Sequence, residues 1–373
     1  MPEKRFIALE KSNCCVLIPS LSPDQRLPDY VRDLLESGFG GVVVVNDGSK
    51  KEYDPFFEAC AAMDGCTVIG YEVNHGKGYA LRYGIRHIYE NTAFEGIITA
   101  DSDGQHTPVD TAKMAAEMDG EHLWLGSRDF TSANTNIPKR SRVGNRITSF
   151  VFKLFYGQYL PDTQTGLRAF PRSLCPFMME VTGDRFEYEM NVLIRCSEKK
   201  IRMLVVPIDT IYLEENKSSH FNPLKDSWRI YKLILGNFLM FIAASLSCWA
   251  LDQGIYALVR YVIMPQQEKV RFLLWDITAG IIVGYIVARI ISSLVNFAIN
   301  KNAVFKIKES KGALLRYFLL AACCLAISTL VTGILSTYVG SGVDWLIKLV
   351  VDLIMFMINY RVQKVWVFRT DAK

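Results

Sequence analysis

Long apolar runs in the C-terminal part of the chain place the strongest constraint on its fold. Of the 373 residues, 50% are hydrophobic and 21% are charged, but the charges are concentrated in residues 1–232 and the apolar runs follow. Four runs are long enough to cross a bilayer, which takes about 20 apolar residues in a helix: Leu233–Val259, Phe272–Ile299, Leu314–Val339 and Trp345–Phe368. A soluble core rarely contains four such runs in succession. The sequence therefore predicts an all-α membrane domain of four transmembrane helices over residues 233–373.

Basic residues gather on one side of the predicted spans. They precede the first span, connect the second span to the third and follow the fourth, which is the positive-inside pattern. We therefore expect a multi-pass protein with its N-terminal half and both termini in the cytosol; the N-terminus also lacks the apolar stretch of a signal peptide. The first outer loop is an exception, with three basic residues, Arg260, Lys269 and Arg271. Residues 222–232 mix Trp228 and Tyr231 with basic residues, and we expect them to form a helix at headgroup level.

Ionisable side chains fall inside the predicted spans: Asp252, Asp276, Arg289 and Asp352. A charge in a bilayer is costly unless it faces the protein interior. Such residues either pair between helices or line a polar path or headgroup site. Both alternatives stay open for Asp252 and Arg289. Asp276 and Asp352 lie nearer the outer ends of their spans, where pairing or an interfacial position is favoured.

Residues 296–306 are repeated, without gaps, as residues 359–369. Four of these eleven positions are identical and four more are conservative. Both copies end an even-numbered span, so the pattern predicts a duplicated two-helix unit.

Short apolar runs alternate with helical patterns in the first half of the chain. The runs predict strands at Cys14–Pro19, Val42–Asn46, Thr67–Glu72, Gly96–Asp101 and His122–Gly126. Helices are expected between them, over residues 25–37, 52–62, 77–90 and 108–118. Strand and helix in alternation predict an α/β domain with a parallel sheet and helices on both faces. In such sheets ligands bind at the carboxyl ends of the strands.

Polar side chains follow the predicted strands at that edge. Asp101, Asp103 and Gln105 would face one side of an extended chain, because side chains alternate in a strand. Their oxygen atoms are the ligands that Mg²⁺ or Mn²⁺ prefers. Two acids at this spacing are also common in solvated turns, and the position at a strand end favours the metal site.

Basic residues point to phosphate. Lys77 opens a helix behind glycines that let backbone N–H groups approach phosphate oxygens, although the Walker A spacing is absent. Arg128 follows a strand, and Arg142 and Arg146 lie one helical turn apart, where paired arginines can bind a phosphate. A solvated helix face is the alternative for the arginines.

Composition argues against two other kinds of function. The net charge of +4 and the absence of a long Lys/Arg tract do not favour a nucleic-acid partner. The nine cysteines include no Cys-x-x-Cys pair, so we expect reduced thiols in the core rather than zinc ligands or disulfides.

Taken in order, five motifs in the first half resemble the family 2 glycosyltransferases of the dolichol-phosphate mannosyltransferase type. The motifs are Asn46-Asp47-Gly48-Ser49, Asn74-His75-Gly76-Lys77-Gly78, Asp101-Ser102-Asp103-Gly104-Gln105-His106, Gly126-Ser127-Arg128 and Asp162-Thr163-Gln164-Thr165-Gly166-Leu167-Arg168, and the match covers residues 13–222. The membrane half resembles the GtrA family of four-helix proteins. The whole chain resembles the fused transferase–GtrA proteins of bacteria. This implies a bacterial cell-membrane protein in which residues 1–221 form a cytosolic α/β domain of GT-A fold, the Rossmann-like fold of nucleotide-diphospho-sugar transferases.

The resemblance also implies roles for individual residues. The donor would be bound by Pro19, Asp47, Lys77 and Asp101, and the metal by Asp101, Asp103 and Gln105. The acceptor phosphate would be bound by Arg128, Arg142 and Arg146, while Gln164 and Arg168 would line the sugar or acceptor side. The catalytic residues would be Asp101, Asp103 and Asp162. Two departures stand out: the usual Pro-x-Tyr-Asn-Glu is replaced by Pro19-Ser20-Leu21-Ser22-Pro23-Asp24, and Asn46 replaces the first acid of Asp-Asp-Gly-Ser.

The reaction implied is metal-dependent, inverting transfer of a sugar from a UDP- or GDP-linked donor to a polyprenyl phosphate. The acceptor has a second pKa of about 6, so it is dianionic at neutral pH and needs no obligatory general base. Asp162 would be either a base or a stabiliser of the sugar cation. Residues 216–220 would either close over the diphosphate or form a plain surface loop. The membrane half would flip the product or act as an anchor, and it is a candidate surface for a homo-oligomer; a processive synthase is disfavoured because Gln-x-x-Arg-Trp is absent.

Overall fold

In the computed structural model the chain divides into two compact units, Met1–Ile234 and Leu235–Lys373. The structure describes residues 9–130, 139–209, 223–264, 269–272, 275–307, 312–339 and 344–368. The loop at residues 216–220 lies outside this part. The boundary between the units falls close to Leu233, where the sequence predicts the start of the membrane domain.

A seven-stranded sheet forms the centre of the first unit, in the order β3-β2-β1-β4-β6-β5-β7. Its strands are β1 (Cys14–Ser20), β2 (Gly41–Asp47), β3 (Cys66–Tyr71), β4 (Gly96–Thr99), β5 (Leu123–Arg128), β6 (Arg168–Pro171) and β7 (Met203–Ile208). The five predicted strands are thus confirmed. The expected all-parallel sheet is wrong, because β6 runs antiparallel to both β4 and β5. The chain returns beside β5 without the crossover to the opposite sheet end that a parallel neighbour requires.

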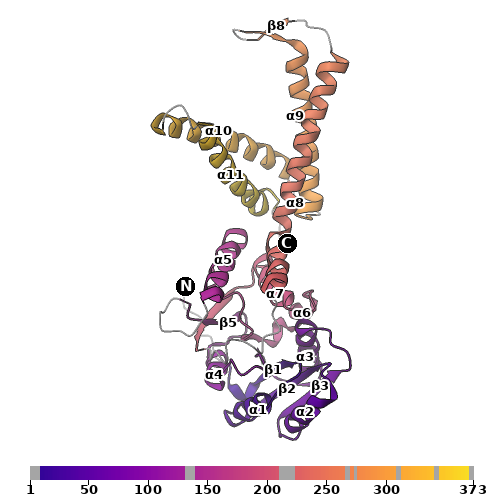
Figure 1. The fold of residues 1–373 in the computed structure, drawn as a ribbon, viewed down its shortest axis with the longest axis vertical. Coiled ribbons are helices and arrows are strands. Elements are labelled where there is room, and N and C mark those ends of the chain that lie inside the picture. Colours follow the sequence, from indigo (N-terminus) through magenta and orange to yellow (C-terminus); the bar gives the residue numbers. More distant parts are fainter. Residues whose placement is uncertain are drawn as a thin grey trace. The chain divides into compact units, whose positions relative to one another are not determined.

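Side chains of the central strands alternate between the two faces of the sheet. Leu17 and Val45 pack on the face covered by α3 (Lys77–Asn91), α6 (Cys175–Glu180) and α7 (Glu187–Lys199). Ile18 and Val44 pack on the other face, covered by α1 (Arg26–Glu36), α2 (Asp54–Ala61) and α4 (Pro108–Glu117). Helices therefore cover both faces, as predicted (Figure 1). Leu17 and Ile18 are fully buried, and burial of such side chains contributes about 1.5–3 kcal/mol each.

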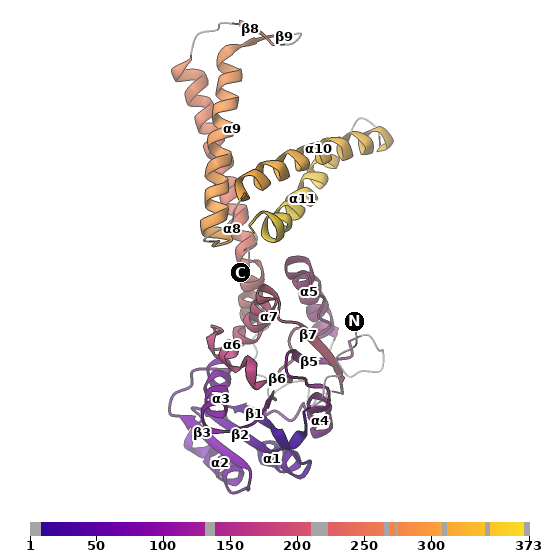
Figure 2. The same ribbon diagram turned by 180° about the vertical axis from the view of Figure 1, so that it is seen from behind.

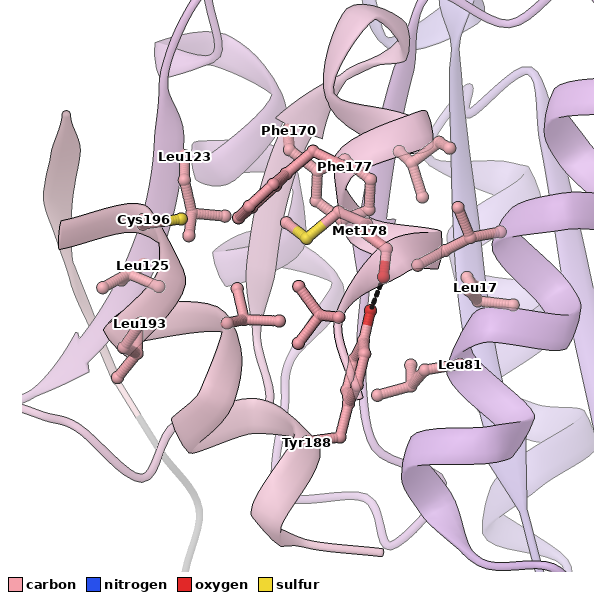
Figure 3. Packing of buried hydrophobic residues seen from close by; sticks show 14 of the residues in the cluster. Leu17, Leu81, Leu123, Leu125, Phe170, Phe177, Met178, Tyr188, Leu193 and Cys196 are labelled. Atoms are coloured by element: carbon pink, nitrogen blue, oxygen red, sulfur yellow. Dashed lines mark hydrogen bonds between the residues drawn. The ribbon is translucent and has the colours of Figure 1, made fainter. Parts of the chain in front are cut away.

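The α3–α6–α7 face is packed tightly around aromatic side chains. Phe170 of β6 and Phe177 and Met178 of α6 pack among the aliphatic residues of this core (Figure 3). The buried Tyr188 hydroxyl of α7 donates a hydrogen bond to the Met178 carbonyl at 2.9 Å. This core fixes α7 relative to α3, which matters because both helices contribute to the site. All nine cysteines are free thiols, six of them buried, as predicted.

The second unit is helical and consists of two helical pairs. Its helices are α8 (Pro223–Ala257), which begins in the first unit, α9 (Ala279–Ile299), α10 (Ala313–Val339) and α11 (Asp344–Val362). The helices α8 and α9 lie side by side (Figure 2), and the short hairpin of β8 (Lys269–Phe272) and β9 (Trp275–Thr278) lies between them in the chain.

Three helical segments of the described residues are long and apolar enough to cross a membrane: Tyr231–Ile263, Ile281–Val304 and Ala313–Thr332. The predicted second span begins too early, because Phe272 and Asp276 belong to the β8–β9 hairpin. The fourth predicted span is not confirmed. The helix α11 is present, but Lys348 and Asp352 interrupt the apolar sequence of its first half, and Arg361 lies towards its end.

The two copies of the sequence repeat adopt the same local structure. Each contains a π-helical turn, at Asn300–Val304 and Gln363–Val367. The buried Asn300 amide donates to Asn296 at 2.7 Å and to Gln363 at 3.1 Å, and the Gln363 amide donates to Asn359 at 3.2 Å. The two repeats therefore meet through corresponding amide side chains.

Candidate active site

The helices α3 and α7 place a lysine and a glutamate close to Asp101, which follows the short strand β4. The lysine contacts both acids. The Nζ atom of Lys77, the first residue of α3, lies 2.6 Å from Asp101 Oδ1 and 3.0 Å from Glu189 Oε1 in the first turn of α7. His106 Nε2 lies 3.5 Å from the other carboxylate oxygen of Asp101. All four side chains are buried or half-buried. Residues separated by more than 100 positions thus form one charged cluster at the carboxyl end of β4.

The segment from Asp101 to His106 is a turn rather than the extended strand that the sequence predicted. The strand β4 already ends at Thr99, and Gly104 has a φ of 78°. The backbone N–H of Gln105 donates to Asp103 Oδ1 at 3.0 Å, so Asp103 closes the turn. The alternation argument for three oxygens on one side therefore fails, although the three side chains still belong to one tight turn.

Charge coupling links the two acids of this turn. Burial raises the pKa of Asp101, but the Lys77 ammonium and the bond to His106 outweigh it and leave the pKa below its ordinary value. Burial and the nearby charge of Asp101 raise the pKa of Asp103. Burial lowers the pKa of Lys77, but the carboxylates of Asp101 and Glu189 outweigh it and raise this pKa.

A hard metal ion, which prefers oxygen ligands, fits the chemistry of this turn. Asp101 and Asp103 supply carboxylate oxygens, and the two carboxylates repel each other electrostatically. Gln105 supplies an amide oxygen. Lys77 already neutralises the charge of Asp101. Among the described residues, no three His, Cys, Asp or Glu side chains are gathered as a ready metal cage. A metal ion at this turn would therefore need the Gln105 amide as its third protein ligand, and the predicted ligand set of Asp101, Asp103 and Gln105 stays a prediction.

Asp47 anchors the loop that leads into α3. Its buried carboxylate accepts hydrogen bonds from the Tyr71 hydroxyl at 2.7 Å and from the backbone N–H groups of His75 at 3.0 Å and Gly76 at 3.0 and 3.1 Å. Gly76 has a φ of 104°, a conformation that favours glycine. The predicted donor-binding residue Asp47 therefore holds the backbone that positions Lys77. The predicted donor-binding Pro19 lies in β1, paired with Val45.

A second cluster joins Arg128 to Asp162. The guanidinium of Arg128, at the end of β5, donates to both carboxylate oxygens, with Nε at 2.6 Å and Nη2 at 3.0 Å. The Asp162 side chain is 0% exposed and also accepts the backbone N–H of Gln164 at 3.0 Å. Bidentate geometry fixes the plane of the guanidinium.

Arg142 and Arg146 lie on α5 (Lys139–Tyr156), which is pinned to the Asp162 loop. The buried Asn145, between the two arginines, donates to the Pro161 carbonyl at 2.6 Å and accepts from the Thr163 N–H at 3.2 Å. Arg142 is half-buried and Arg146 is exposed. The helix is therefore attached at Asn145 to the loop that holds Arg128, with Arg142 and Arg146 on the flanking positions of the same helix.

The Asp162 loop also touches the first cluster. Thr99 Oγ1 donates to the Gly166 carbonyl at 2.8 Å, and a Cβ atom at Gly166 would lie 2.4 Å from an Asp101 carboxylate oxygen. Arg168 is buried and donates to the carbonyls of Thr165 at 3.1 Å and Glu189 at 2.8 Å. Arg168, predicted on the sugar or acceptor side, thus braces this loop against α7.

Sequence reasoning missed Glu189 and gave His106 no role. Glu189 belongs to no motif and is one of two acids in the first turn of α7. Its only signal is a helix that starts with acids, which is common because acids favour helix N-termini. The contact with Lys77 depends on tertiary packing.

Two family models match the chain. Residues 15–176 match glycosyl transferase family 2, and residues 266–368 match the GtrA/DPMS transmembrane domain. The chain is therefore a transferase with a family 2 glycosyltransferase domain in its first unit and a GtrA/DPMS transmembrane domain in its helical second unit.

Known relatives are similar to a large part of the chain. The UDP-N-acetylglucosamine–dolichyl-phosphate N-acetylglucosaminyltransferase of Methanococcus voltae is 29% identical over 59% of this chain and 94% of its own length. Glycosyltransferase AglJ of Haloferax volcanii is 26% identical over 58% of this chain and 69% of its own length. The undecaprenyl-phosphate 4-deoxy-4-formamido-L-arabinose transferase of Pseudomonas paraeruginosa is 26% identical over 44% of this chain and 48% of its own length.

Proposed function

We propose that this chain transfers a sugar from a UDP- or GDP-linked donor to the phosphate of a polyprenyl phosphate, with inversion at the sugar carbon. The observation that carries the proposal is a contact between two segments. One is the turn from Asp101 to His106, called the acid turn, and the other is the loop from Asp162 to Gly166, whose Asp162 holds Arg128. This contact joins a turn whose carboxylates suit a metal–diphosphate to a loop whose Asp162 holds an arginine suited to a second phosphate. Two named relatives act on dolichyl or undecaprenyl phosphate, which supports the same class of acceptor here.

An exposed apolar face on α5 supports a lipid acceptor. Val143, Ile147 and Phe150 follow one another at helical spacing and are 58%, 48% and 62% exposed. Arg146 is exposed on the same helix. An amphipathic helix with apolar and basic faces suits a bilayer surface, where the acceptor phosphate would lie. With the positive-inside pattern, this supports a cytosolic catalytic unit on a multi-pass membrane protein.

The proposed chemistry needs charge neutralisation more than a base. Mg²⁺ or Mn²⁺ bound by Asp101, Asp103 and Gln105 would neutralise charge on the leaving nucleoside diphosphate. Arg128, Arg142 and Arg146 would orient the acceptor dianion, whose oxygen is itself the nucleophile. The Asp162 carboxylate is occupied by Arg128 and by the Gln164 N–H. We therefore assign Asp162 to holding Arg128 rather than to accepting a proton.

The membrane unit is proposed to act as an anchor. Arg289 Nη2 of α9 lies 3.6 Å from Asp252 Oδ2 of α8, and the Ser292 hydroxyl donates a hydrogen bond to Asp252 Oδ1 at 2.8 Å. This pairing across the helices supports the first of the two alternatives for these residues. A flippase remains the competing function, and movement of lipid-linked sugar across reconstituted vesicles at rates above empty vesicles would favour it.

The test is a screen of nucleotide-sugars with polyprenyl phosphate and Mn²⁺ or Mg²⁺, scored by lipid-linked product. Asp103→Ala should abolish transfer and leave membrane insertion intact, whereas Asp33→Ala, an exposed acid of α1, should leave transfer unchanged. Arg142→Ala should raise the KM for polyprenyl phosphate more than the KM for the donor. Full transfer in the presence of a metal chelator would remove the metal from the proposal, and transfer to free sugars instead of lipid phosphate would refute the acceptor.

A further inference from the structure

The Lys77 ammonium already occupies the carboxylate that the proposed metal needs. Its Nζ atom is 2.6 Å from Asp101 Oδ1, and His106 Nε2 is 3.5 Å from Oδ2. Each oxygen of Asp101 therefore faces a nitrogen of the protein. A metal that binds Asp101 brings a second cation to the same carboxylate, and it therefore competes with the Lys77 ammonium.

Glu189 gives Lys77 a second partner of the same kind. Glu189 Oε1 lies 3.0 Å from Nζ, and its side chain is 13% exposed, so the attraction is poorly screened by water. Glu189 is itself held, because its carbonyl accepts a hydrogen bond from Arg168 at 2.8 Å. If Lys77 leaves Asp101, one carboxylate still neutralises it and keeps it beside the acid turn.

A purely structural role for this ion pair is disfavoured by the other bonds between the same elements. The Tyr79 N–H of α3 donates to the Asp184 carbonyl at 3.0 Å, and Arg82 of α3 bonds to the Gly183 carbonyl and to the Asp184 carboxylate. The α3 helix is therefore braced against the segment before α7 without Lys77. The positive charge of Lys77 is therefore not needed to hold α3 and α7 together.

We propose that Lys77 exchanges partners during the reaction cycle: it neutralises Asp101 in the free enzyme and turns to the donor diphosphate when metal and donor bind, while Glu189 keeps hold of it. Glu189 is then a positioning residue that acts through Lys77. The inference rests on the proposed function, because it needs a metal at Asp101. It predicts opposite effects of the two residues on metal binding in the absence of donor.

The experiment measures Mn²⁺ binding to the full-length protein in detergent by electron paramagnetic resonance, first without nucleotide and then with UDP or GDP. Lys77→Met removes the competing cation and should tighten Mn²⁺ binding without nucleotide on the order of tenfold, while it weakens nucleotide binding. Glu189→Gln leaves Lys77 with Asp101 alone and should weaken Mn²⁺ binding by a similar factor. Glu189→Asp should recover part of that loss, and Glu198→Gln, an exposed acid of the same helix, should behave as wild type.

The outcomes separate the two levels of the proposal. If wild type binds Mn²⁺ and both Lys77→Met and Glu189→Gln bind it with the wild-type Kd, the partner exchange is wrong although the proposed function stands. If wild type binds no Mn²⁺ in any nucleotide state, the metal role and the exchange fall together. Should Lys77→Met not fold, the Glu189→Gln and Glu189→Asp pair decides the matter, since Glu189→Gln must weaken Mn²⁺ binding and Glu189→Asp must restore it in part.

Discussion

Truncation of Arg128 is predicted to destabilise the catalytic unit strongly, because it would leave the Asp162 carboxylate buried without its cation. The Asp162 side chain is 0% exposed, and Arg128→Ala removes contacts of 2.6 and 3.0 Å. Each charge-assisted hydrogen bond contributes about 1.5–3 kcal/mol, so the loss is about 3–6 kcal/mol. Breaking a buried ion pair on one side costs about 3–5 kcal/mol, which agrees. Among the described residues, the backbone N–H groups of Gln164, at 3.0 Å, and of residue 128, at 3.4 Å, would still face the carboxylate.

The assay is thermal unfolding of the full-length protein in detergent. For a unit of this size, a loss of about 3–5 kcal/mol lowers the Tm by roughly 6–20 °C. Arg32→Ala is the matched control, since Arg32 forms an exposed pair with Asp29 at 3.2 Å and should change stability by less than about 1 kcal/mol. Adding Asp162→Asn to Arg128→Ala removes the orphaned charge and should restore part of the Tm. A Tm for Arg128→Ala within about 2 °C of wild type would refute the reasoning.

Three further predictions concern the acid turn, its neighbouring loop and the membrane unit. The raised pKa of Asp103 means that its contribution to stability is present below the ordinary pKa of aspartate and is lost as the pH rises through the folded-state value. Asp103→Asn should therefore raise the Tm of the ligand-free protein at neutral pH and flatten its pH dependence. Gly166→Ala places a Cβ 2.4 Å from an Asp101 oxygen and should lower kcat for transfer at least about tenfold, whereas Gly144→Ala has open space and should not. Asn300→Ala removes the hydrogen bond that the Asn300 amide donates to the buried Gln363 side chain. The free energy of unfolding of the membrane unit should fall by about 1–3 kcal/mol, measured as a lower Tm in detergent.

The sequence was sufficient for the strands β1 to β5 and the helices α1 to α4, since alternation and capping are local, whereas β6, β7, α6 and α7 were not among the predicted elements. Leu17 and Ile18 face opposite sides of the sheet because side chains alternate, and Thr107 caps α4 by accepting the Asp110 N–H at 3.0 Å. The direction of β6 was not predictable in the same way. Its four residues are all buried, so they carry no alternation, and strand direction depends on how the chain returns after α5.

The cluster around Asp101 contains residues that the sequence singled out, but the contacts among them were not predictable. Asp101 and Lys77 were singled out by their positions at element ends, where polar side chains serve ligands. The turn at Gly104 could not be read from the acid spacing, because a strand and a turn accept the same residues there. Glu189 escaped because its contact spans 112 positions from Lys77, which only tertiary packing brings together.

The buried ion pairs of the candidate site indicate which kind of side chain could select the sugar. Four charged residues of the candidate site form two ion pairs, Asp101 with Lys77 and Asp162 with Arg128. A ligand bound there would replace one charged partner with another, and such a replacement would favour the phosphates of any donor equally. Sugars differ in neutral hydroxyl and amide groups, so the choice among them needs a neutral side chain that reaches solvent. In the loop from Asp162 to Gly166, Gln164 is exposed while its four neighbours are buried, and its backbone bond to Asp162 fixes where it stands. Replacement of Gln164 by Ala is therefore expected to change the ratio of kcat/KM between donor sugars while leaving nucleotide binding as it is.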